Sequence, residues 1–390
     1  MDKNIELQVI RTIHPVGQGA FYTETLHRPG SNDDKHIVYD CGSLTSYKIL
    51  EREILDYLPR GSTIDVLFIS HFHSDHVNGI GLLSKIYKIK HVVLPQVDDY
   101  DWFYIIENYL TNGEADVDLI SDVRASIGDA GLVQVAPMEE NGDNYPVSDE
   151  SITLDGFRGG IINGRSPLVI SNGMLSLWHY IVINPLMKGD LKELKKAIQE
   201  IDFNGRKLTI DDLHNPDILA AVRGDLQIVY SKVFKGGNEY SMCMLSELAV
   251  RKQYGSCPWF NKGHYHYWDL KRYVYLHDGY PLCGRDGCLY CGDADFLHYN
   301  TLDCLKQRLK GREDYVGLLQ LPHHGSKESF SIDLLNWLED LLVTFACYGS
   351  PNRYKHPSTS VMGAASTFSI AVGVNQYTSN VLTERVDVFK

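Results

Sequence analysis

The residues with the clearest capacity for chemistry form one short cluster, HFHSDH at residues 71–76. Its histidines and its aspartate can all bind metal ions, because imidazole suits zinc and similar metals and a carboxylate suits these or a harder ion such as manganese. In a loop, His71 and His73 can point to one side. Asp75 and His76 can then point to another, so that one segment serves two metal ions. The cluster therefore predicts a metal centre.

The sequence around this cluster predicts the elements that position it. The apolar run VLFI at residues 66–69 precedes it and is typical of a strand buried on both faces. After it, Ile80, Leu83 and Ile86 have helical spacing. The cluster therefore lies in a strand-to-helix loop, where open α/β sheets bind ligands. The plain alternative, a polar loop that is rich in histidine by chance, is disfavoured by this order and context.

The HFHSDH cluster resembles the signature of the metallo-β-lactamase fold, and other segments are similar to the soluble hydrolase domain of ComEC-type DNA-uptake proteins. In chain order these segments are HPVGQGA at 14–20 with IVYDCG at 37–42, CGD at 291–293, LPHHGS at 321–326 and YKHP at 354–357. The resemblance implies an α/β fold, a metallo-β-lactamase αββα sandwich, as a single domain over residues 1–390. It leaves two long insertions, a helical one within about 98–237 and an aromatic-rich one at about 251–285.

The same resemblance implies a set of metal ligands. They are His71 and His73 for one ion and Asp75, His76 and His324 for the other, with Asp293 as the bridge. The implied cofactors are two divalent ions, with zinc as the first choice and manganese as the alternative. Two such ions can share a hydroxide that attacks the substrate, so no Ser or Cys nucleophile is needed.

Several residues near the predicted ligands have more than one interpretation. Neighbouring side chains on an extended segment diverge, so we favour His324 as the ligand and His323 as a contact to the substrate phosphate. His356 is a candidate general acid or phosphate donor, or else a histidine held beside a proline turn. The predicted catalytic residues are accordingly Asp75, His323 and His356. Asp40 would orient a ligand histidine, or would serve only as a cap or turn residue.

One expected ligand is missing from the sequence. Many metallo-β-lactamase enzymes supply a third histidine to the first metal from a strand in the middle of the chain. Here the corresponding place holds Asn238-Glu239 or Ser241, a gap that ComEC-type domains share. We therefore expect the site of His71 and His73 to bind its ion less tightly than the other site. A binding module without activity is the alternative.

Two further groups of residues have alternative interpretations. Cys283, Cys288 and Cys291, with Cys257, His264 and His266 upstream, form either a structural zinc site or a set of free thiols. We favour free thiols, because side chains alternate between the two faces of a strand. The aromatic run Tyr265-His266-Tyr267-Trp268 either stacks bases, encloses a cationic group or packs in a core.

The charge of the chain limits the class of partner. The formal net charge is −13, with 37 Lys and Arg against 50 Asp and Glu. A protein that grips duplex DNA normally has a clustered basic face, whereas the basic segments at 85–90, 192–196 and 306–312 fit the solvent faces of helices. We therefore expect a single-stranded nucleic acid or a small phosphodiester as the partner. Nothing in the sequence indicates a protein partner.

No segment of the sequence indicates a membrane or an export route. No apolar run approaches the length of a membrane span, and the first residues lack the pattern of a signal peptide. The eight cysteines show no compact disulfide spacing. We expect a cytoplasmic protein that does not bind a membrane.

The sequence therefore predicts a metal-dependent hydrolase of phosphodiester bonds, either a nuclease or a nucleotide phosphodiesterase, that acts through a metal-bound hydroxide. One alternative is a hydrolase of another small ester or a lactam-like substrate, since this fold hosts many reactions. The other is a metal-binding subunit of a bacterial defence or DNA-uptake system.

Overall fold

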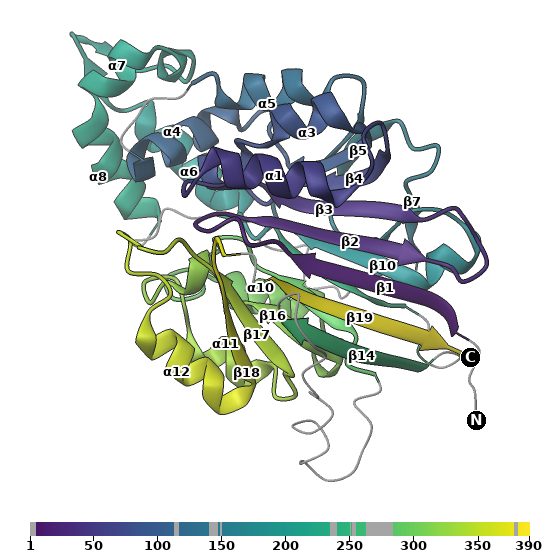
Figure 1. The fold of residues 1–390 in the computed structure, drawn as a ribbon. Helices are drawn as coiled ribbons and strands as arrows, with labels where there is room; N and C mark the ends of the chain where they lie inside the picture. The colour runs from purple at the N-terminus through teal and green to yellow at the C-terminus, as the bar shows by residue number, and fades with distance from the viewer. Residues whose placement is uncertain are drawn as a thin grey trace.

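The computed structural model describes residues 5–112, 117–139, 147–148, 150–234, 240–249, 251, 255–262, 284–377 and 381–390. Two large sheets lie face to face in it (Figure 1). Within the described residues the first sheet has nine strands, in the spatial order β14 (Gly255–Lys262), β19 (Leu382–Phe389), β1 (Ile5–Ile13), β2 (Phe21–His27), β3 (Lys35–Cys41), β4 (Thr63–Phe68), β5 (Lys88–Pro95), β6 (Gly131–Val135) and β8 (Gly159–Ile162).

The described part of the second sheet has eight strands. They are β18 (Ile370–Val374), β17 (Val343–Cys347), β16 (Val316–Gln320), β15 (Gly287–Tyr290), β13 (Cys243–Leu248), β10 (Trp178–Ile183), β9 (Leu168–Val169) and β7 (Ile152–Thr153). The strands β15 to β18 run parallel, as β3 to β6 do in the first sheet. A separate hairpin consists of β11 (Asp202–Phe203) and β12 (Arg206–Lys207).

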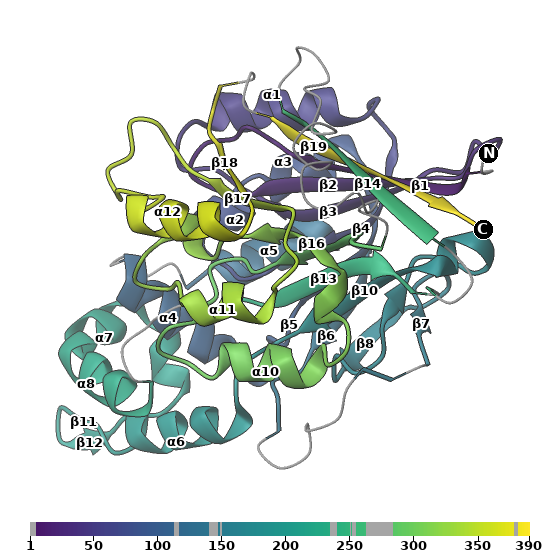
Figure 2. The ribbon, with the colours of Figure 1, turned by 90° about the horizontal axis from the view of Figure 1, so that it is seen from below.

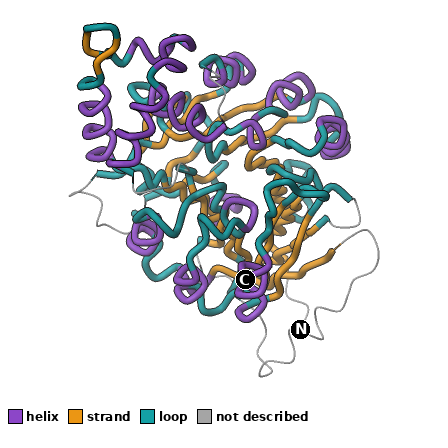
Figure 3. Tube along the Cα trace, turned by 90° about the vertical axis from the view of Figure 1, so that its left-hand side faces the viewer, coloured by secondary structure: helices purple, strands orange, loops and turns teal. Residues whose placement is uncertain are grey.

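Helices cover the outer face of each sheet (Figures 1 to 3). Those on the side of the first sheet are α1 (Tyr47–Tyr57), α2 (Ser74–Val77), α3 (Ile80–Ile86), α4 (Asp101–Asn112) and α5 (Leu119–Ile127). The helices on the second sheet, seen in front in Figure 2, are α10 (Thr301–Arg308), α11 (Ile332–Trp337) and α12 (Thr359–Phe368). A helical lobe at one side contains α6 (Lys188–Ile198), α7 (Pro216–Ala221) and α8 (Arg223–Val233).

Three hydrophobic cores among the described residues hold these layers together. The middle core lies between the sheets and contains Phe68 from β4 and Tyr180 from β10, whose ring centroids lie 5.4 Å apart. The two outer cores lie between each sheet and its helices. β4 is buried on both of its faces, which is why its sequence is apolar without alternation. The predicted αββα sandwich is therefore confirmed.

The stretch predicted as the first insertion has a mixed character. Its later part is helical, as expected, and forms α6, α7 and α8. Its earlier part, however, supplies β6 and β8 to the first sheet and β7, β9 and β10 to the second. Residues 98–237 therefore complete the sandwich as well as adding to it. In the described part of the chain, every helix is too short or too polar to cross a lipid bilayer.

Candidate metal centre

The predicted site residues come from loops at the carboxyl ends of parallel strands. Asp40 lies at the end of β3, and residues 71–76 follow β4. Asp293 follows β15, and His324 follows β16. Because parallel strands point the same way, their loops lie at one edge of each sheet, which is where such sheets bind ligands. The two sheets bring these loops together.

Two glycines let other loops pass close to the segment with the ligands. A Cβ atom at Gly19, where φ is +145°, would lie 2.4 Å from the carbonyl oxygen of Gly42 and 2.7 Å from that of Asp75. A Cβ atom at Gly42 would lie 2.5 Å from the backbone nitrogen of His76. The backbone N–H of Ala20 donates to the carbonyl of Asp75 at 3.0 Å. Glycine is therefore required in both segments to seat α2.

The first group of candidate ligands consists of Asp75, His76, Asp293 and His324, all of them buried. Nε2 of His76 lies 3.1 Å from Oδ1 of Asp293, and Nε2 of His324 lies 3.7 Å from the same oxygen. Nε2 of His324 also lies 3.2 Å from Oδ2 of Asp75. The four ligand atoms lie within 4.8 Å of one another, which is close enough for a single cation to contact all of them.

The second group consists of His71, His73 and Asp293 and is also buried. Nε2 of His71 lies 3.8 Å from Oδ2 of Asp293. Asp293 is common to both groups, and its two oxygens face different histidines. The rings of His71 and His76 have centroids only 4.1 Å apart, so the groups lie next to each other.

Asp40 controls the orientation of a histidine in each group. Its Oδ2 accepts a hydrogen bond from Nδ1 of His76 at 2.7 Å. The same oxygen accepts from Oγ of Ser70 at 2.7 Å, and Oδ1 accepts from the backbone N–H of Ser70. Since the hydroxyl hydrogen of Ser70 is committed to Asp40, its oxygen can accept from Nδ1 of His71, 2.9 Å away. Both histidines therefore direct Nε2 towards Asp293.

Ser241, one of the candidates for the place of the missing third histidine, lies beside His71. Its Oγ lies 3.0 Å from Nδ1 of His71 and accepts the backbone N–H of Asp293 at 2.9 Å. It therefore contacts the side of His71 that faces away from Asp293. Ser241 thus connects His71 with the backbone of Asp293, but it is not itself a member of either group of candidate ligands. Asn238 and Glu239, the other candidates for this place, lie outside the described residues.

The charges of the site depend strongly on one another. Burial would lower the pKa of His76, but the carboxylates of Asp293 and Asp40 outweigh it and hold that pKa well above its ordinary value. Burial would raise the pKa of Asp293, but the imidazoles of His76, His324 and His323 hold it well below. By contrast, burial and the nearby imidazoles lower the pKa of His71 well below its ordinary value.

These features fit bound cations. Nδ1 of His76 donates to Asp40, whereas its buried Nε2 lies 3.1 Å from Oδ1 of Asp293 without forming a hydrogen bond in the described part of the chain. A cation held by His76 and Asp293 would offset the negative charge of this carboxylate. His71 is neutral and its buried Nε2 has no hydrogen-bond partner in the described part of the chain. A buried polar atom without a partner is costly, and a metal ion would supply one.

The two adjacent histidines differ in their exposure. The side chain of His324 is 1% exposed and that of His323 is 22% exposed. Nδ1 of His324 donates to the carbonyl of Cys347 at 2.9 Å, whereas Nδ1 of His323 contacts Oγ of Ser329. The expectation of an extended segment was wrong, because φ is +47° at His323 and +55° at His324. This left-handed turn is a strained conformation of the kind found at functional sites.

His356 lies beside His323, with 5.2 Å between the ring centroids. Its Nδ1 lies 3.2 Å from the carbonyl oxygen of His323, which can only accept, so Nδ1 carries the hydrogen. Burial lowers the pKa of His356 to about 4. At neutral pH this imidazole is therefore uncharged and its Nε2 bears the lone pair.

α4 supports the loop of residues 71–76, which we call the ligand loop, from the side of the first sheet. Nδ2 of Asn108 donates to the carbonyl of Phe72 at 3.2 Å, and the rings of Phe72 and Tyr104 lie 5.2 Å apart. Oε1 of Glu107 accepts the backbone N–H of Tyr240 at 2.7 Å. The start of the predicted first insertion therefore connects the ligand loop to the segment that carries Ser241.

Parts of the cysteine and aromatic predictions lie outside the described structure. Cys288 and Cys291 are buried free thiols on and next to β15. Residues 263–283, which include Cys283, His264 and His266 and the predicted stacking residues Tyr265, Tyr267 and Trp268, are not among the described residues. The same holds for the side chain of Cys257.

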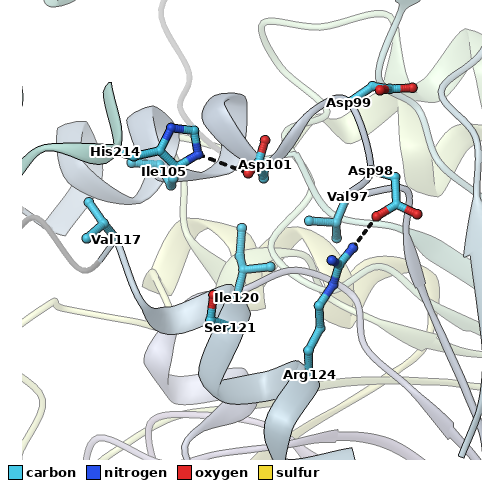
Figure 4. A pocket seen from close by; sticks show the side chains of 10 residues that line it. All are labelled: Val97, Asp98, Asp99, Asp101, Ile105, Val117, Ile120, Ser121, Arg124 and His214. Carbon is cyan, nitrogen blue, oxygen red and sulfur yellow. Dashed lines mark hydrogen bonds and ion pairs between the residues drawn. The ribbon is translucent and has the colours of Figure 1, made fainter. Parts of the chain in front are cut away.

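A separate pocket of about 280 Å³ lies between α4, α5 and the turn that ends at His214 (Figure 4). Two pairs of interacting side chains lie among its lining residues. Asp98 pairs with Arg124 at 2.5 Å, and Asp101 pairs with His214 at 2.9 Å. None of its lining residues belongs to the two ligand groups.

Comparison with known proteins agrees with this architecture. The model of the metallo-beta-lactamase superfamily matches residues 28–164, which include the 71–76 cluster but neither Asp293 nor His324. No curated protein matches the sequence. The two facing sheets, their helical layers and the buried His/Asp cluster define a metallo-β-lactamase fold. Residues 28–164 of the chain are therefore similar to the metallo-β-lactamase superfamily.

Several solved structures are similar to the chain. The metallo-β-lactamase fold protein YhfI from Bacillus subtilis is 9% identical, with 97% of this chain and 99% of that chain covered and a TM-score of 0.35. The short form of human tRNase Z is 10% identical, with 96% and 98% covered and a TM-score of 0.37. Unliganded yeast PDE1 is 10% identical, with 97% and 99% covered and a TM-score of 0.41.

Proposed function

We propose that this protein is a divalent-metal-dependent phosphodiesterase that cleaves nucleotide or single-stranded nucleic-acid phosphodiesters in the cytoplasm, like the hydrolase domain of ComEC-type proteins. The proposed ligands are Asp75, His76 and His324 for one ion and His71 and His73 for the other, with Asp293 shared. Divalent ions at two adjacent sites, when bound, supply Lewis acidity to a phosphate and make water more acidic. Zinc is the first candidate and manganese the second.

The observation that carries the proposal is the position of Asp293 between the two groups. Its Oδ1 faces His76 and His324, and its Oδ2 faces His71. A carboxylate that faces imidazoles on both sides is suited to bridging two cations. Two adjacent cations suit phosphodiester cleavage, in which the attacking and the leaving oxygen both need stabilisation.

Two histidines outside the ligand groups are proposed to meet the substrate. His323 lies 3.8 Å from Oδ2 of Asp293 and is partly exposed, so a phosphate at the centre can reach it. His356 lies behind it and is neutral in the free protein. It can therefore accept a proton or a hydrogen bond at once, whereas a donor role requires an anionic phosphate to raise its pKa. Asp40, which accepts from Nδ1 of His76, holds that ligand histidine in place.

The direct test is hydrolysis of bis(p-nitrophenyl) phosphate by protein loaded with zinc or manganese. We expect turnover that requires the metal and is lost in Asp293→Ala. A p-nitrophenyl monoester, a chromogenic lactam and a phosphocholine ester serve as comparison substrates. Preference for the lactam or the choline ester would point to a different hydrolase. Metal binding without turnover of any of these substrates would indicate a binding subunit.

A further inference from the structure

The loop that follows β17 extends the candidate centre towards solvent. A row of neighbouring side chains begins at Asp293, whose Oδ2 lies 3.8 Å from Nε2 of His323. The ring of His356 lies 5.2 Å from that of His323, and the ring of Tyr354 lies 6.2 Å from that of His356. A continuous row of side chains therefore leads from the shared carboxylate to an exposed tyrosine.

Asn352 holds this loop in a defined conformation. Its Oδ1 accepts the backbone N–H of Tyr354 at 2.8 Å, and its Nδ2 donates to the carbonyl of His356. Nδ2 also lies 3.4 Å from Oε1 of Gln18. Gln18 belongs to the buried turn whose Gly19 packs against Asp75. The exposed loop is therefore tied to the same turn that seats the ligand segment.

Arg353, Tyr354 and Lys355 are the exposed residues at the tip of this loop, and we call them the rim triad. Tyr354 is 42% exposed. The guanidinium carbon of Arg353 lies 4.8 Å from the centre of the Tyr354 ring, and its Nη2 donates to the phenol oxygen at 2.5 Å. On a chain with a net charge of −13, two cations and an exposed ring thus lie beside the centre.

We propose that the rim triad recognises a nucleotide unit next to the scissile phosphodiester. Tyr354, with the guanidinium of Arg353, stacks on a nucleobase, and Arg353 and Lys355 pair with the next phosphate along a single strand. The inference rests on the proposed function, because it names the substrate class of the same centre.

The chemistry of the triad favours a nucleotide over other phosphodiesters. Bases stack on tyrosine rings and on guanidinium planes with little sequence preference. Arg and Lys pair with phosphates, Arg in a bidentate manner. A choline or glycerol diester offers a phosphate but no flat aromatic base. Because this contact involves only a few phosphates, it suits a short single strand and not a long duplex.

The test compares a thymidine trinucleotide with an analogue in which tetrahydrofuran units replace the nucleosides. The manganese-loaded protein is assayed by chromatography of the products. We expect Tyr354→Ala to raise KM for the trinucleotide by about tenfold, with kcat within about twofold of the wild type, and to leave the abasic analogue unchanged. Tyr354→Phe keeps the ring and should behave as the wild type does.

Arg353→Ala should raise KM for both the trinucleotide and the abasic analogue, because both carry the phosphate with which Arg353 pairs. Its matched control is Arg28→Ala, an exposed arginine in the β2–β3 hairpin, at the end of β3 opposite to Asp40. In parallel, fluorescence anisotropy measures the affinity of a labelled thymidine tetranucleotide for the metal-free protein and its Tyr354→Ala variant. This arm needs no turnover, so it separates recognition from catalysis.

The outcomes separate the two proposals. If the wild type cleaves no diester but binds the tetranucleotide, and Tyr354→Ala weakens that binding about tenfold, the proposed function fails and the recognition role stands. If Tyr354→Ala affects the trinucleotide and the abasic analogue equally, or leaves both cleavage and affinity unchanged, the recognition role is overturned. Absence of tetranucleotide binding by the wild type also overturns it.

Discussion

Nδ1 of His76 donates a hydrogen bond to Oδ2 of Asp40 at 2.7 Å. The same carboxylate reaches His71 through the hydroxyl of Ser70. One buried aspartate therefore fixes the ring orientation in both candidate ligand groups. Partners of this kind typically contribute a factor of about 10 to 100 to metal affinity.

We expect Asp40→Asn to weaken metal binding by about 10- to 100-fold. Asparagine tolerates the backbone of this position, where φ is +56°. Its amide, however, has only one oxygen. It therefore cannot accept from the backbone N–H of Ser70 at one atom and from Oγ of Ser70 and Nδ1 of His76 at the other, as the carboxylate does. Isothermal titration with zinc, in the presence of a competing chelator, measures the loss.

The matched control for Asp40 is Asp65→Asn. Asp65 is also a buried aspartate of the first sheet, but it accepts from the backbone of His36 and pairs with Lys90. The Asp65→Asn variant should lower the stability of the protein without changing its affinity for metal. Equal metal affinities of Asp40→Asn and the wild type would refute the orienting role.

His324→Ala should lose metal, and His323→Ala should not. The reason is that His324 is buried against Asp75, whereas His323 is partly exposed and lies on the solvent side. We expect about one equivalent less metal in His324→Ala. His323→Ala should keep the metal and raise KM for a phosphodiester. Elemental analysis with kinetics checks this, and loss of metal only in the His323 variant would reverse the assignment.

The stoichiometry of two aspartate variants tests the sharing of Asp293. Asp75 belongs to one ligand group and Asp293 to both. Asp75→Ala should therefore lose one ion, and Asp293→Ala should weaken the binding of both. Both variants should lose hydrolysis and keep the circular dichroism of the wild type. If Asp293→Ala retained the ion held by His71 and His73, the bridging role would be wrong.

The sequence predicted the layers of the fold because its strongest patterns are local. The apolar run of β4 and the helical spacing of Ile80, Leu83 and Ile86 were both found where expected. The cluster at 71–76 and the later Asp293 and His324 could be placed by motif order. These residues are brought together by strands that each carry a motif at the carboxyl end.

The supporting residues could not be predicted in the same way. Ser70 and Ser241 are common residue types without a motif, and their importance arises only from contacts across the two sheets. The sequence marks Tyr354 and Lys355 only as part of the YKHP segment, and Arg353 and Lys355 form no long basic run that would indicate a phosphate-binding surface. The left-handed turn at His323 and His324 has no glycine at either position to mark it. Tertiary contacts, not local preference, impose that turn.

The core between the sheets contains a titrating carboxylate, Glu384. It shares the guanidinium of Arg11 with Glu24, and burial raises its pKa to about 7 in spite of that cation. The ordinary carboxyl value is 4.5, so the folded protein binds an additional proton between these two pH values. The resulting stabilisation is complete below the ordinary value and is lost as the pH rises through about 7.

We therefore expect the thermal midpoint of the wild type to fall between pH 6 and pH 8 by more than that of Glu384→Gln, which stays neutral. The two midpoints are compared in the absence of metal, so that titration of the histidines and aspartates of the candidate centre affects both proteins equally. Glu200→Gln, which changes an exposed carboxylate paired with Lys207, should keep the decline of the wild type. An equal decline in Glu384→Gln would show that this carboxylate is ionised in the folded state.

Removal of the Arg11 guanidinium from this core should lower the free energy of unfolding by more than the change in Glu384 does. Arg11 is fully buried between Glu24 and Glu384, and its Nη2 also donates to the carbonyl of Ser246 at 3.0 Å. Arg11→Met leaves two carboxylates without a cation, a change that typically costs about 3 to 5 kcal/mol. Urea unfolding at pH 7 measures this loss. A change below about 1 kcal/mol would mean that the carboxylates are neutral in the fold.

The most direct test of the central claim is anomalous diffraction from a crystal soaked in manganese. We predict two peaks, one on each side of the carboxylate of Asp293, with the peak beside Asp75, His76 and His324 the stronger. The weaker peak should lie beside His71 and His73. Absence of both peaks, or a single peak that does not contact Asp293, would contradict the two-ion centre and the phosphodiesterase function that depends on it.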